Sequence, residues 1–95
     1  MKKTISTEKL QILRKGNEGF LLVDVLDKAA FDLDHIPGAR NVPLDTLGFP
    51  QVVADKNAGS KTRRVVLYGA STQCEAPAKA AKLLVADGFT NVVLY

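Results

Sequence analysis

The sequence is poor in cysteine, histidine and tryptophan, which disulfide-rich, zinc-binding and base-stacking proteins require. Its 95 residues include one cysteine, one histidine and no tryptophan. A single cysteine excludes an intramolecular disulfide framework, and one cysteine with one histidine excludes a zinc cluster. We therefore expect no metal site. Few aromatic rings are available on which nucleic-acid bases could stack.

Long hydrophobic runs are also missing. No uncharged stretch approaches the roughly 18–20 apolar residues of a membrane span. The residues after Met1-Lys2-Lys3 are polar and do not form the apolar core of a signal peptide. We therefore expect a cytoplasmic protein that does not enter a membrane. Its length suits a single domain over residues 1–95.

The charge excess is small. Thirteen Lys and Arg face ten Asp and Glu, for a net charge of +3. This balance favours a small anion over nucleic acid as a ligand. The one dense basic cluster, Lys61-Thr62-Arg63-Arg64, is interpreted as a solvated turn before a strand.

Short apolar runs alternate with segments of helical spacing. The runs are too short for helices and indicate strands buried on both faces, at 19–25, 64–68 and 91–95. Asn41–Leu44 is typical of an edge strand because it contains Pro43, and Ile5 fits a short first strand.

Helices are expected between these strands. They are predicted over 28–33 and from about 75–77 to 87, with Gly88 just beyond the second. A further helix within 45–55 is expected to be broken by Pro50. The alternation predicts an α/β fold: a central parallel sheet of about five strands with helices on both faces.

Ligands of parallel sheets bind beyond the carboxyl ends of the strands. The loop at 69–75 therefore stands where a site is expected. A compact turn that enters a helix presents backbone N–H groups to an anion and lowers the pKa of a nearby thiol. Cys74, the only soft nucleophile, is in this loop. Glu75 opposes thiolate formation, and the alternative is that Cys74 is an inert packing residue, as most free cysteines are.

The chain resembles the rhodanese-homology domain over almost its whole length. The most specific match is His35-Ile36-Pro37-Gly38-Ala39, which follows a strand ending in Asp24-Val25. The matching segments, in the order in which the family has them, are 21–25, 34–43, 65–68, 80–84 and 88–92. The resemblance implies an α/β fold with a central parallel sheet. Active members carry sulfane sulfur as a persulfide on a cysteine directly after the Tyr-ended strand, and the following loop cradles its anion.

The chain departs from this family at the position that matters most for the chemistry. Gly69 stands where the persulfide cysteine is expected, and Cys74 matches a second cysteine found in a subset of the family. An arginine often found near the end of the loop is absent. Leu26 replaces a common Arg, and Asp34 replaces the usual Gly. The substrate loop implied by the resemblance comprises Gly69, Ala70, Ser71, Thr72, Gln73, Cys74 and Glu75.

The last strand ends the chain at Tyr95, whereas the family normally continues through a Gly-Gly turn and a Trp-bearing helical segment. We therefore expect a fold shortened at its C-terminal end. An exposed apolar patch would then favour weak self-association, so a monomer or weak homodimer is expected.

Three further side chains support the predicted site. Asp24 ends a strand at the ligand edge, where it could orient the loop or contact substrate. His35 is interpreted as a structural residue of a Pro-Gly turn, with a catalytic base as the alternative. Arg40 could bind an anion, or it could be a solvated or ion-paired arginine.

These observations predict a rhodanese-like domain of the thiosulfate sulfurtransferase family without standard activity, because Gly69 occupies the cysteine position. It would act as a binding or regulatory module whose ligand is a protein partner or a small, thiosulfate-like anion. No cofactor is required. Two alternatives stay open: a sulfurtransferase that uses Cys74, or an active enzyme whose catalytic cysteine has been replaced at position 69.

Overall fold

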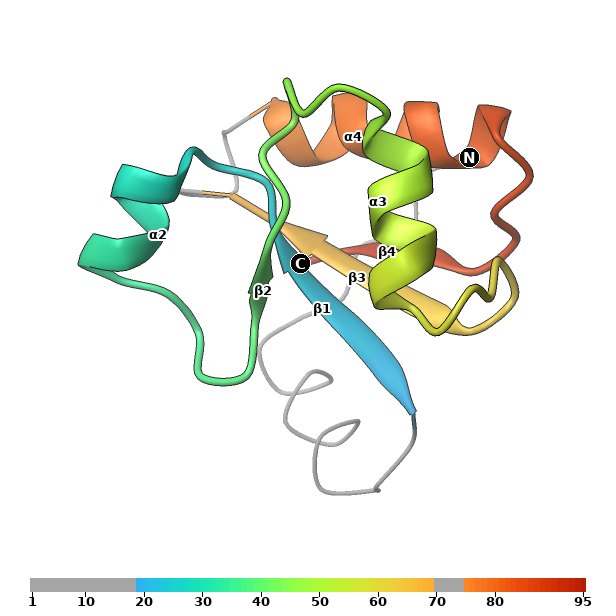
Figure 1. The fold of residues 1–95 in the computed structure, drawn as a ribbon, viewed down its shortest axis with the longest axis horizontal. Coiled ribbons are helices and arrows are strands. Elements are labelled where there is room, and N and C mark those ends of the chain that lie inside the picture. Colours follow the sequence, from blue (N-terminus) through green and yellow to red (C-terminus); the bar gives the residue numbers. More distant parts are fainter. Residues whose placement is uncertain (1–18, 70–74) are drawn as a thin grey trace.

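The computed structural model describes residues 19–69 and 75–95. Within them the element order is β1, α2, β2, α3, β3, α4 and β4 (Figure 1). The first strand expected at Ile5 lies outside the described residues. The expectation of about five strands is therefore not confirmed, since the described residues form a sheet of four.

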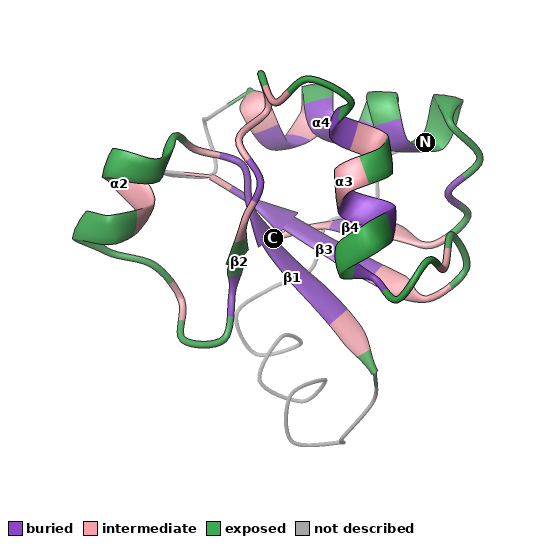
Figure 2. Ribbon diagram, viewed as in Figure 1, coloured by how far each residue is buried: buried purple, intermediate pink, exposed green. Residues whose placement is uncertain are grey.

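All neighbouring strands of the sheet are parallel, in the order β2-β1-β3-β4. The strands are β1 (Phe20–Asp24), β2 (Arg40–Asn41), β3 (Arg64–Tyr68) and β4 (Val92–Leu94). In the two central strands, β1 and β3, every residue after the first is buried (Figure 2). Uninterrupted apolar runs are expected where a strand is covered on both faces. Strand β2 is an edge strand, as its following proline predicts, but only Arg40 and Asn41 pair with β1.

Helix α2 (Lys28–Leu33) begins at Asp27, whose Oδ1 accepts a hydrogen bond from the Ala30 N–H at 2.9 Å. Such a cap supplies a partner for one of the N–H groups that have none within the helix. Helix α3 (Phe49–Lys56) corrects our expectation of a helix broken by Pro50. Pro50 lies in the first turn of α3, where its missing N–H would have had no intrahelical partner.

Helix α4 (Ala76–Ala86) has Pro77 in its first turn. It ends as the sequence predicts, because Gly88 adopts a positive φ of 98°. The Phe89 N–H then donates to the Leu84 carbonyl at 3.0 Å, which satisfies a carbonyl of the last turn. This turn returns the chain to the sheet and allows β4 to pair with β3.

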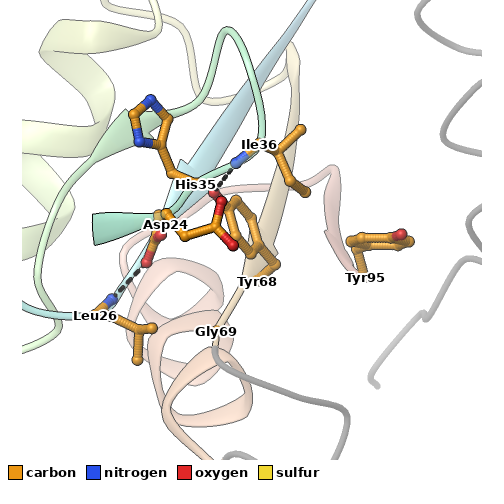
Figure 3. Close-up of a pocket in the computed structure, with 8 residues that line it drawn as sticks. Asp24, Leu26, His35, Ile36, Tyr68, Gly69 and Tyr95 are labelled. Carbon is orange, nitrogen blue, oxygen red and sulfur yellow. Dashed lines mark hydrogen bonds between the residues drawn. The ribbon is translucent and has the colours of Figure 1, made fainter. Parts of the chain in front are cut away.

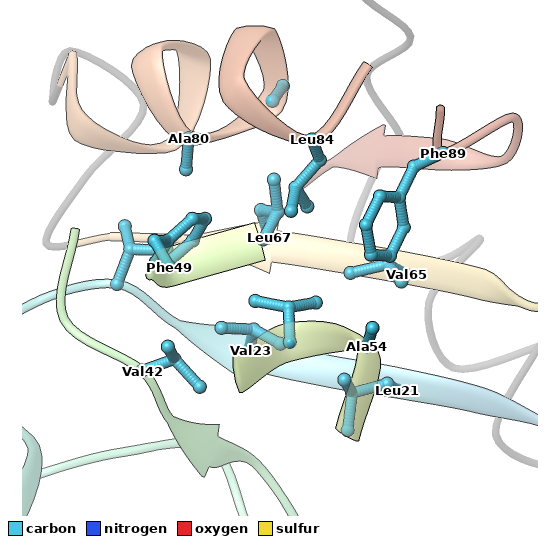
Figure 4. Packing of buried hydrophobic residues seen from close by; sticks show 13 residues of the cluster. Leu21, Val23, Val42, Phe49, Ala54, Val65, Leu67, Ala80, Leu84 and Phe89 are labelled. Atoms are coloured by element: carbon cyan, nitrogen blue, oxygen red, sulfur yellow. The ribbon is translucent and has the colours of Figure 1, made fainter. Parts of the chain in front are cut away.

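The core consists of two clusters, one on each face of the sheet. Helices α3 and α4 pack over the larger cluster (Figures 1 and 4). On the other face Phe31 of α2 packs against a smaller cluster that contains Leu22, Val66 and Val93. Helices thus contribute to both faces, in agreement with the predicted α/β architecture. The larger cluster comprises Leu21, Val23, Val25, Val42, Phe49, Val53, Ala54, Val65, Leu67, Ala80, Ala81, Leu84 and Phe89.

The amino edge of the sheet, where β1 and β3 begin, is held by polar side chains. Asn57 is fully buried and its Nδ2 donates to the carbonyls of Ser60 and Arg63. Its Oδ1 accepts from Arg63 Nη1 at 2.6 Å, and Arg63 Nη2 reaches the Phe20 carbonyl at 3.2 Å. The interpretation of residues 61–64 as a solvated turn was therefore wrong for Arg63, which joins this loop to β1.

Lys61 makes a second connection near this edge. Its Nζ donates to the Asp87 carbonyl at 2.8 Å and lies 3.1 Å from Asp87 Oδ2. Both side chains are about half exposed, so this ion pair contributes little to the free energy of unfolding. In the described part of the chain, no helix has the length and apolar character needed to cross a membrane.

Candidate functional site

A pocket opens at the opposite, carboxyl edge of the sheet. Its volume is about 460 Å³, within the range of small-molecule sites. In the β1–β3 register Asp24 is paired with Tyr68, so the last residues of the two central strands meet at its floor. The described lining residues are Asp24, Leu26, Asp34, His35, Ile36, Tyr68, Gly69 and Tyr95 (Figure 3).

Asp24 is one of two fully buried polar residues in the described parts of the chain. Its Oδ1 accepts a hydrogen bond from the Leu26 N–H at 2.9 Å. Its Oδ2 is buried too and has no close donor among the described residues, although the Tyr68 hydroxyl interacts with the Asp24 side chain. A buried acceptor without a close donor costs free energy.

Tyr68 lies beside Asp24 at the end of β3. Its hydroxyl oxygen accepts a hydrogen bond from the Ile36 N–H at 3.0 Å (Figure 3). The pKa of Tyr68 is raised to about 12, mainly by burial; the Ile36 N–H lowers it, while the negative charge of Asp24 and the interaction of the hydroxyl with the Asp24 side chain raise it. The phenol therefore stays protonated at neutral pH and fixes the start of the Ile36-Pro37-Gly38 turn.

The chain that leaves β1 is held in place by backbone and amide hydrogen bonds. Asn41 Nδ2 donates to the carbonyls of Asp24 and Leu26, at 3.1 and 2.8 Å. The Val25 N–H donates to the Tyr68 carbonyl at 3.1 Å. These bonds fix the backbone that carries the Asp24 side chain. The Asp24 side chain is therefore positioned by the strand ends of the sheet.

His35 lines the pocket, yet its ring is held by the preceding helix, α2. Its Nδ1 lies 2.8 Å from the Phe31 carbonyl oxygen, which can only accept, so Nδ1 carries the proton in this bond. The ring also stacks on Phe31, with centroids 3.8 Å apart. These contacts support the structural interpretation of His35 at the end of α2.

The charged side chains that line the described part of the pocket are acidic. Asp24 lies at its floor, and Asp34 is exposed. No Lys or Arg is among the described lining residues. Arg40, which the sequence offered as an anion ligand, is exposed on β2 and does not line the pocket. The described lining thus offers hydrogen-bond acceptors and negative charge.

The structure brings together Asp24, His35 and Gly69 among the residues that the sequence singled out. Residues 70–74, including Cys74, lie outside the described residues. Glu75 is exposed at the start of α4 and makes no side-chain cap. It is not among the pocket-lining residues.

Sequence reasoning missed Tyr68 and Tyr95 as site residues. Both follow or end apolar runs that were assigned to strands, and both face the same edge because their strands are parallel. An aromatic residue with a polar tip at the carboxyl end of a buried strand was the available signal. The order of the strands, which puts the end of β4 and so Tyr95 beside the end of β3, was not available.

Comparison with known proteins connects this fold to one family. The model of the rhodanese-like domain family matches residues 6–95. A thiosulfate sulfurtransferase GlpE of Pseudomonas putida is 37% identical over 90 residues, which cover 95% of this chain and 74% of that protein.

Solved structures share the fold. The BH2092 protein of Bacillus halodurans superposes with a TM-score of 0.78 and 29% identity over 98% of this chain, which spans only 64% of its length. The single-domain sulfurtransferase RDL2 of Saccharomyces cerevisiae has a TM-score of 0.76 at 16% identity, over all of this chain and 83% of that one. At that identity the likeness to RDL2 concerns the fold alone.

Proposed function

Since this chain belongs to the rhodanese-like family, we propose that it is a rhodanese-like binding module that does not carry out standard thiosulfate sulfurtransfer. The observation that carries the proposal is Gly69. It directly follows the Tyr-ended strand β3 and lines the pocket, where the family places its persulfide cysteine. Glycine has no sulfur atom to accept the sulfane sulfur of thiosulfate.

The ligand of the module is a protein partner or a small sulfur-containing anion. The acidic residues of the described lining favour the protein partner, because Asp24 and Asp34 would weaken, without preventing, the binding of an anion such as thiosulfate. A rigid site is useful for either role. The hydrogen bonds of Asn41 and Tyr68 hold the pocket walls before any ligand arrives.

The test compares the unmodified chain with Gly69→Cys and Cys74→Ser. In the Gly69→Cys variant the introduced thiolate would attack the outer sulfur of thiosulfate, forming a persulfide while the bond to sulfite breaks. We expect no thiocyanate from the unmodified chain with thiosulfate and cyanide. For Gly69→Cys we expect an intact mass increased by one sulfur atom.

Turnover by the unmodified chain would overturn the proposal. If Cys74→Ser then abolished that turnover, Cys74 would be the sulfur carrier and the chain would be an unusual sulfurtransferase. If the turnover survived in Cys74→Ser, no cysteine could be responsible, because the chain has only one.

A further inference from the structure

Helix α2 is the least buried helix in the described part of the chain. None of its residues is buried, whereas α3 buries three residues and α4 buries four (Figure 2). It projects from one side of the sheet, away from α3 and α4 (Figure 1). Its last residue, Leu33, is 88% exposed. Segments with few buried contacts open locally while the rest of a protein stays folded.

The segment that carries α2 is attached to the sheet by few contacts. We call residues 27–36 the flap. The hydrogen bonds of these residues run within the flap or to the adjoining Ala39, with one exception. The exception is the Ile36 N–H, which donates to the Tyr68 hydroxyl at 3.0 Å. Phe31 and Ile36 also pack, half-buried, on the smaller core cluster. Detachment of the flap therefore breaks one hydrogen bond and uncovers two half-buried side chains.

Both ends of the flap are fixed to the sheet, so the flap can detach without separating the strands. On one side the Leu26 N–H donates to Asp24 Oδ1, and the Leu26 carbonyl accepts from Asn41 Nδ2 of β2. On the other side Ala39 is buried and leads directly into β2. Gly38, between the flap and Ala39, has a φ of 87°. A glycine there can change φ without a Cβ clash, which suits a hinge.

Packing beneath this hinge is incomplete. A pocket of about 220 Å³ is lined by Phe20 and Leu22 of β1 on one side and by Pro37 and Gly38 on the other. A gap between packed groups removes dispersion contacts that would hold the hinge to the sheet. Helix α2 itself has six residues, too few for a stable isolated helix. Detachment of the flap therefore also unfolds α2.

The flap forms one wall of the pocket at the carboxyl edge. It supplies Asp34, His35 and Ile36 to the lining, whereas Tyr68 ends β3 and Gly69 follows it. With the flap in place, the pocket volume of about 460 Å³ suits a small molecule. With the flap detached, this wall is removed while the strand ends stay in position. The open site then has room for a longer ligand.

We propose that the flap opens and closes while the sheet stays folded, with the Tyr68 hydroxyl as its latch, and that opening admits a peptide segment of a protein partner to the pocket. This inference names the partner and the regulation of the binding module proposed above and rests on that proposal. Small anions such as thiosulfate reach the pocket with the flap closed, in agreement with the expected loading of Gly69→Cys.

Native-state amide hydrogen exchange, followed by NMR, tests the opening. The reporters are the Phe31 and Ile36 amides of the flap and the Val65 amide, which donates to the Asn91 carbonyl in the centre of the sheet. Relative to their intrinsic rates, we expect the flap amides to exchange at least about a hundredfold faster than Val65. Low concentrations of urea should hardly change the flap rates, because local opening exposes little surface.

Two variants separate local opening from global unfolding. Lys61→Met, at the amino edge, should speed exchange at Val65 about twofold and leave the flap amides unchanged. Tyr68→Phe removes the latch and should speed exchange at Phe31 about fivefold.

A matched pair of substitutions within α2 identifies the contact that holds the flap. Phe31 packs on the sheet, whereas Leu33 is 88% exposed. Phe31→Ala should speed exchange at Ile36 about tenfold, because a half-buried ring is lost. Leu33→Ala removes an apolar side chain from the same helix and should leave exchange at Ile36 unchanged.

The proposal is overturned if Lys61→Met speeds the flap amides as much as Val65, because the flap would then open only when the whole protein unfolds. It is also overturned if Tyr68→Phe leaves exchange at Phe31 unchanged, or if Phe31→Ala and Leu33→Ala have equal effects. Should Phe31→Ala lose the dispersed amide spectrum of a folded protein, Lys61→Met and Tyr68→Phe decide.

Disulfide exchange tests whether the flap controls the access of a peptide. The background combines Gly69→Cys with Cys74→Ser, so that the introduced thiol is the only one. The probes are methyl 2-pyridyl disulfide and the same 2-pyridyl disulfide carried by the cysteine of acetyl-Ala-Ala-Cys-Ala-Ala-amide. In both reactions the introduced thiolate forms a disulfide with the probe and pyridine-2-thione leaves.

The ratio of the two rates reports access, because the reacting groups are the same. Adding Phe31→Ala should raise the peptide rate about tenfold relative to the methyl rate, and adding Leu33→Ala should not change the ratio. An unchanged ratio in Phe31→Ala would overturn the control of access by the flap. None of these measurements reads sulfur transfer from thiosulfate. Failure of the binding-module proposal, seen as thiocyanate formation by the unmodified chain, is therefore distinguishable from failure of this one.

Discussion

The buried polar side chains at the two edges of the sheet differ in whether all of their hydrogen-bonding atoms have partners. At the amino edge Asn57 is fully buried, and both its amide nitrogen and its amide oxygen have hydrogen-bond partners. At the carboxyl edge Asp24 is equally buried, yet one of its two carboxylate oxygens has no donor among the described residues. The same sheet thus has one edge at which the buried polar side chain is fully hydrogen-bonded and one at which a carboxylate oxygen has no close donor among the described residues.

This difference assigns the amino edge mainly to the stability of the fold and the carboxyl edge to its candidate functional site. A polar residue whose hydrogen bonds are all made inside the protein supports the fold. A buried acceptor without a donor lowers the stability, and such departures concentrate at functional sites. Mutations at the two edges should therefore have different consequences, and four predictions test this.

The largest loss of stability is expected from Asn57→Ala. The substitution removes three side-chain hydrogen bonds and leaves Arg63 Nη1 without its acceptor. We expect the free energy of unfolding to fall by about 3 kcal/mol, measured by urea denaturation. Gln51→Ala is the matched control, because Gln51 is an exposed amide on α3 that bonds only Asp55 among the described contacts. Equal effects of the two substitutions would contradict the structural role of the amino edge.

Tyr68 should make the protein sensitive to alkali. The unfolded chain loses the phenol proton near the ordinary pKa of 10.0, whereas the folded protein holds it to about 12. The folded state binds the proton more tightly, so the contribution of Tyr68 is complete below pH 10 and declines between pH 10 and 12.

Tyr68→Phe isolates this contribution. It should lower the stability at neutral pH by about 1 kcal/mol, because the Ile36 N–H loses its acceptor. The difference in stability between the two proteins should shrink from pH 10 to 12, measured by urea denaturation at each pH. A difference that stays constant over this range would show that Tyr68 ionises equally in both states.

A smaller effect is expected from Lys61→Met. The variant loses the hydrogen bond to the Asp87 carbonyl and the half-exposed ion pair, and we expect a loss of about 0.5 kcal/mol. Lys28→Met is the comparison, since the Lys28–Asp32 pair is more exposed and lies within one helix turn. Its effect should be smaller still and should vanish in high salt. A larger loss from Lys28→Met would reverse the expected order.

At Asp24, on the carboxyl edge, we expect a change in stability that is small compared with that of Asn57→Ala. Asp24→Asn keeps an acceptor for the Leu26 N–H and removes a buried charge, so the free energy of unfolding should change by less than about 1 kcal/mol. Urea denaturation beside Asn57→Ala gives the direct comparison of the edges. A loss at Asp24 as large as that at Asn57 would mean that the carboxyl edge, too, is primarily structural.

The sequence predicted the central part of the fold because its signals are local. Apolar runs bounded by polar or glycine residues marked β1, β3 and β4, and Gly88 marked the end of α4. Pro50 was misread because a proline interrupts a helix only in its interior, and its position relative to the first turn was not evident from the sequence alone.

The site was only partly predictable for a different reason. Asp24 and Gly69 were recognised because each directly follows or ends a strand, which fixes its edge. The closeness of Tyr95 to this edge depends on the strand order, and the pairing of Asn57 with Arg63 depends on two loop residues turning inward. These two features cannot be predicted from hydrophobic periodicity, because they depend on contacts between separate segments of the chain.

The parallel pairing of β1 with β3 also has a consequence for how the chain folds. The two strands that form the centre of the sheet are separated along the chain by α2, β2 and α3. Their register cannot form until that whole segment has closed into a loop, and folding is slow when contacts are distant in sequence. Until then two short valine- and leucine-rich strands are exposed, so newly made chains at high concentration should aggregate before they reach the native state.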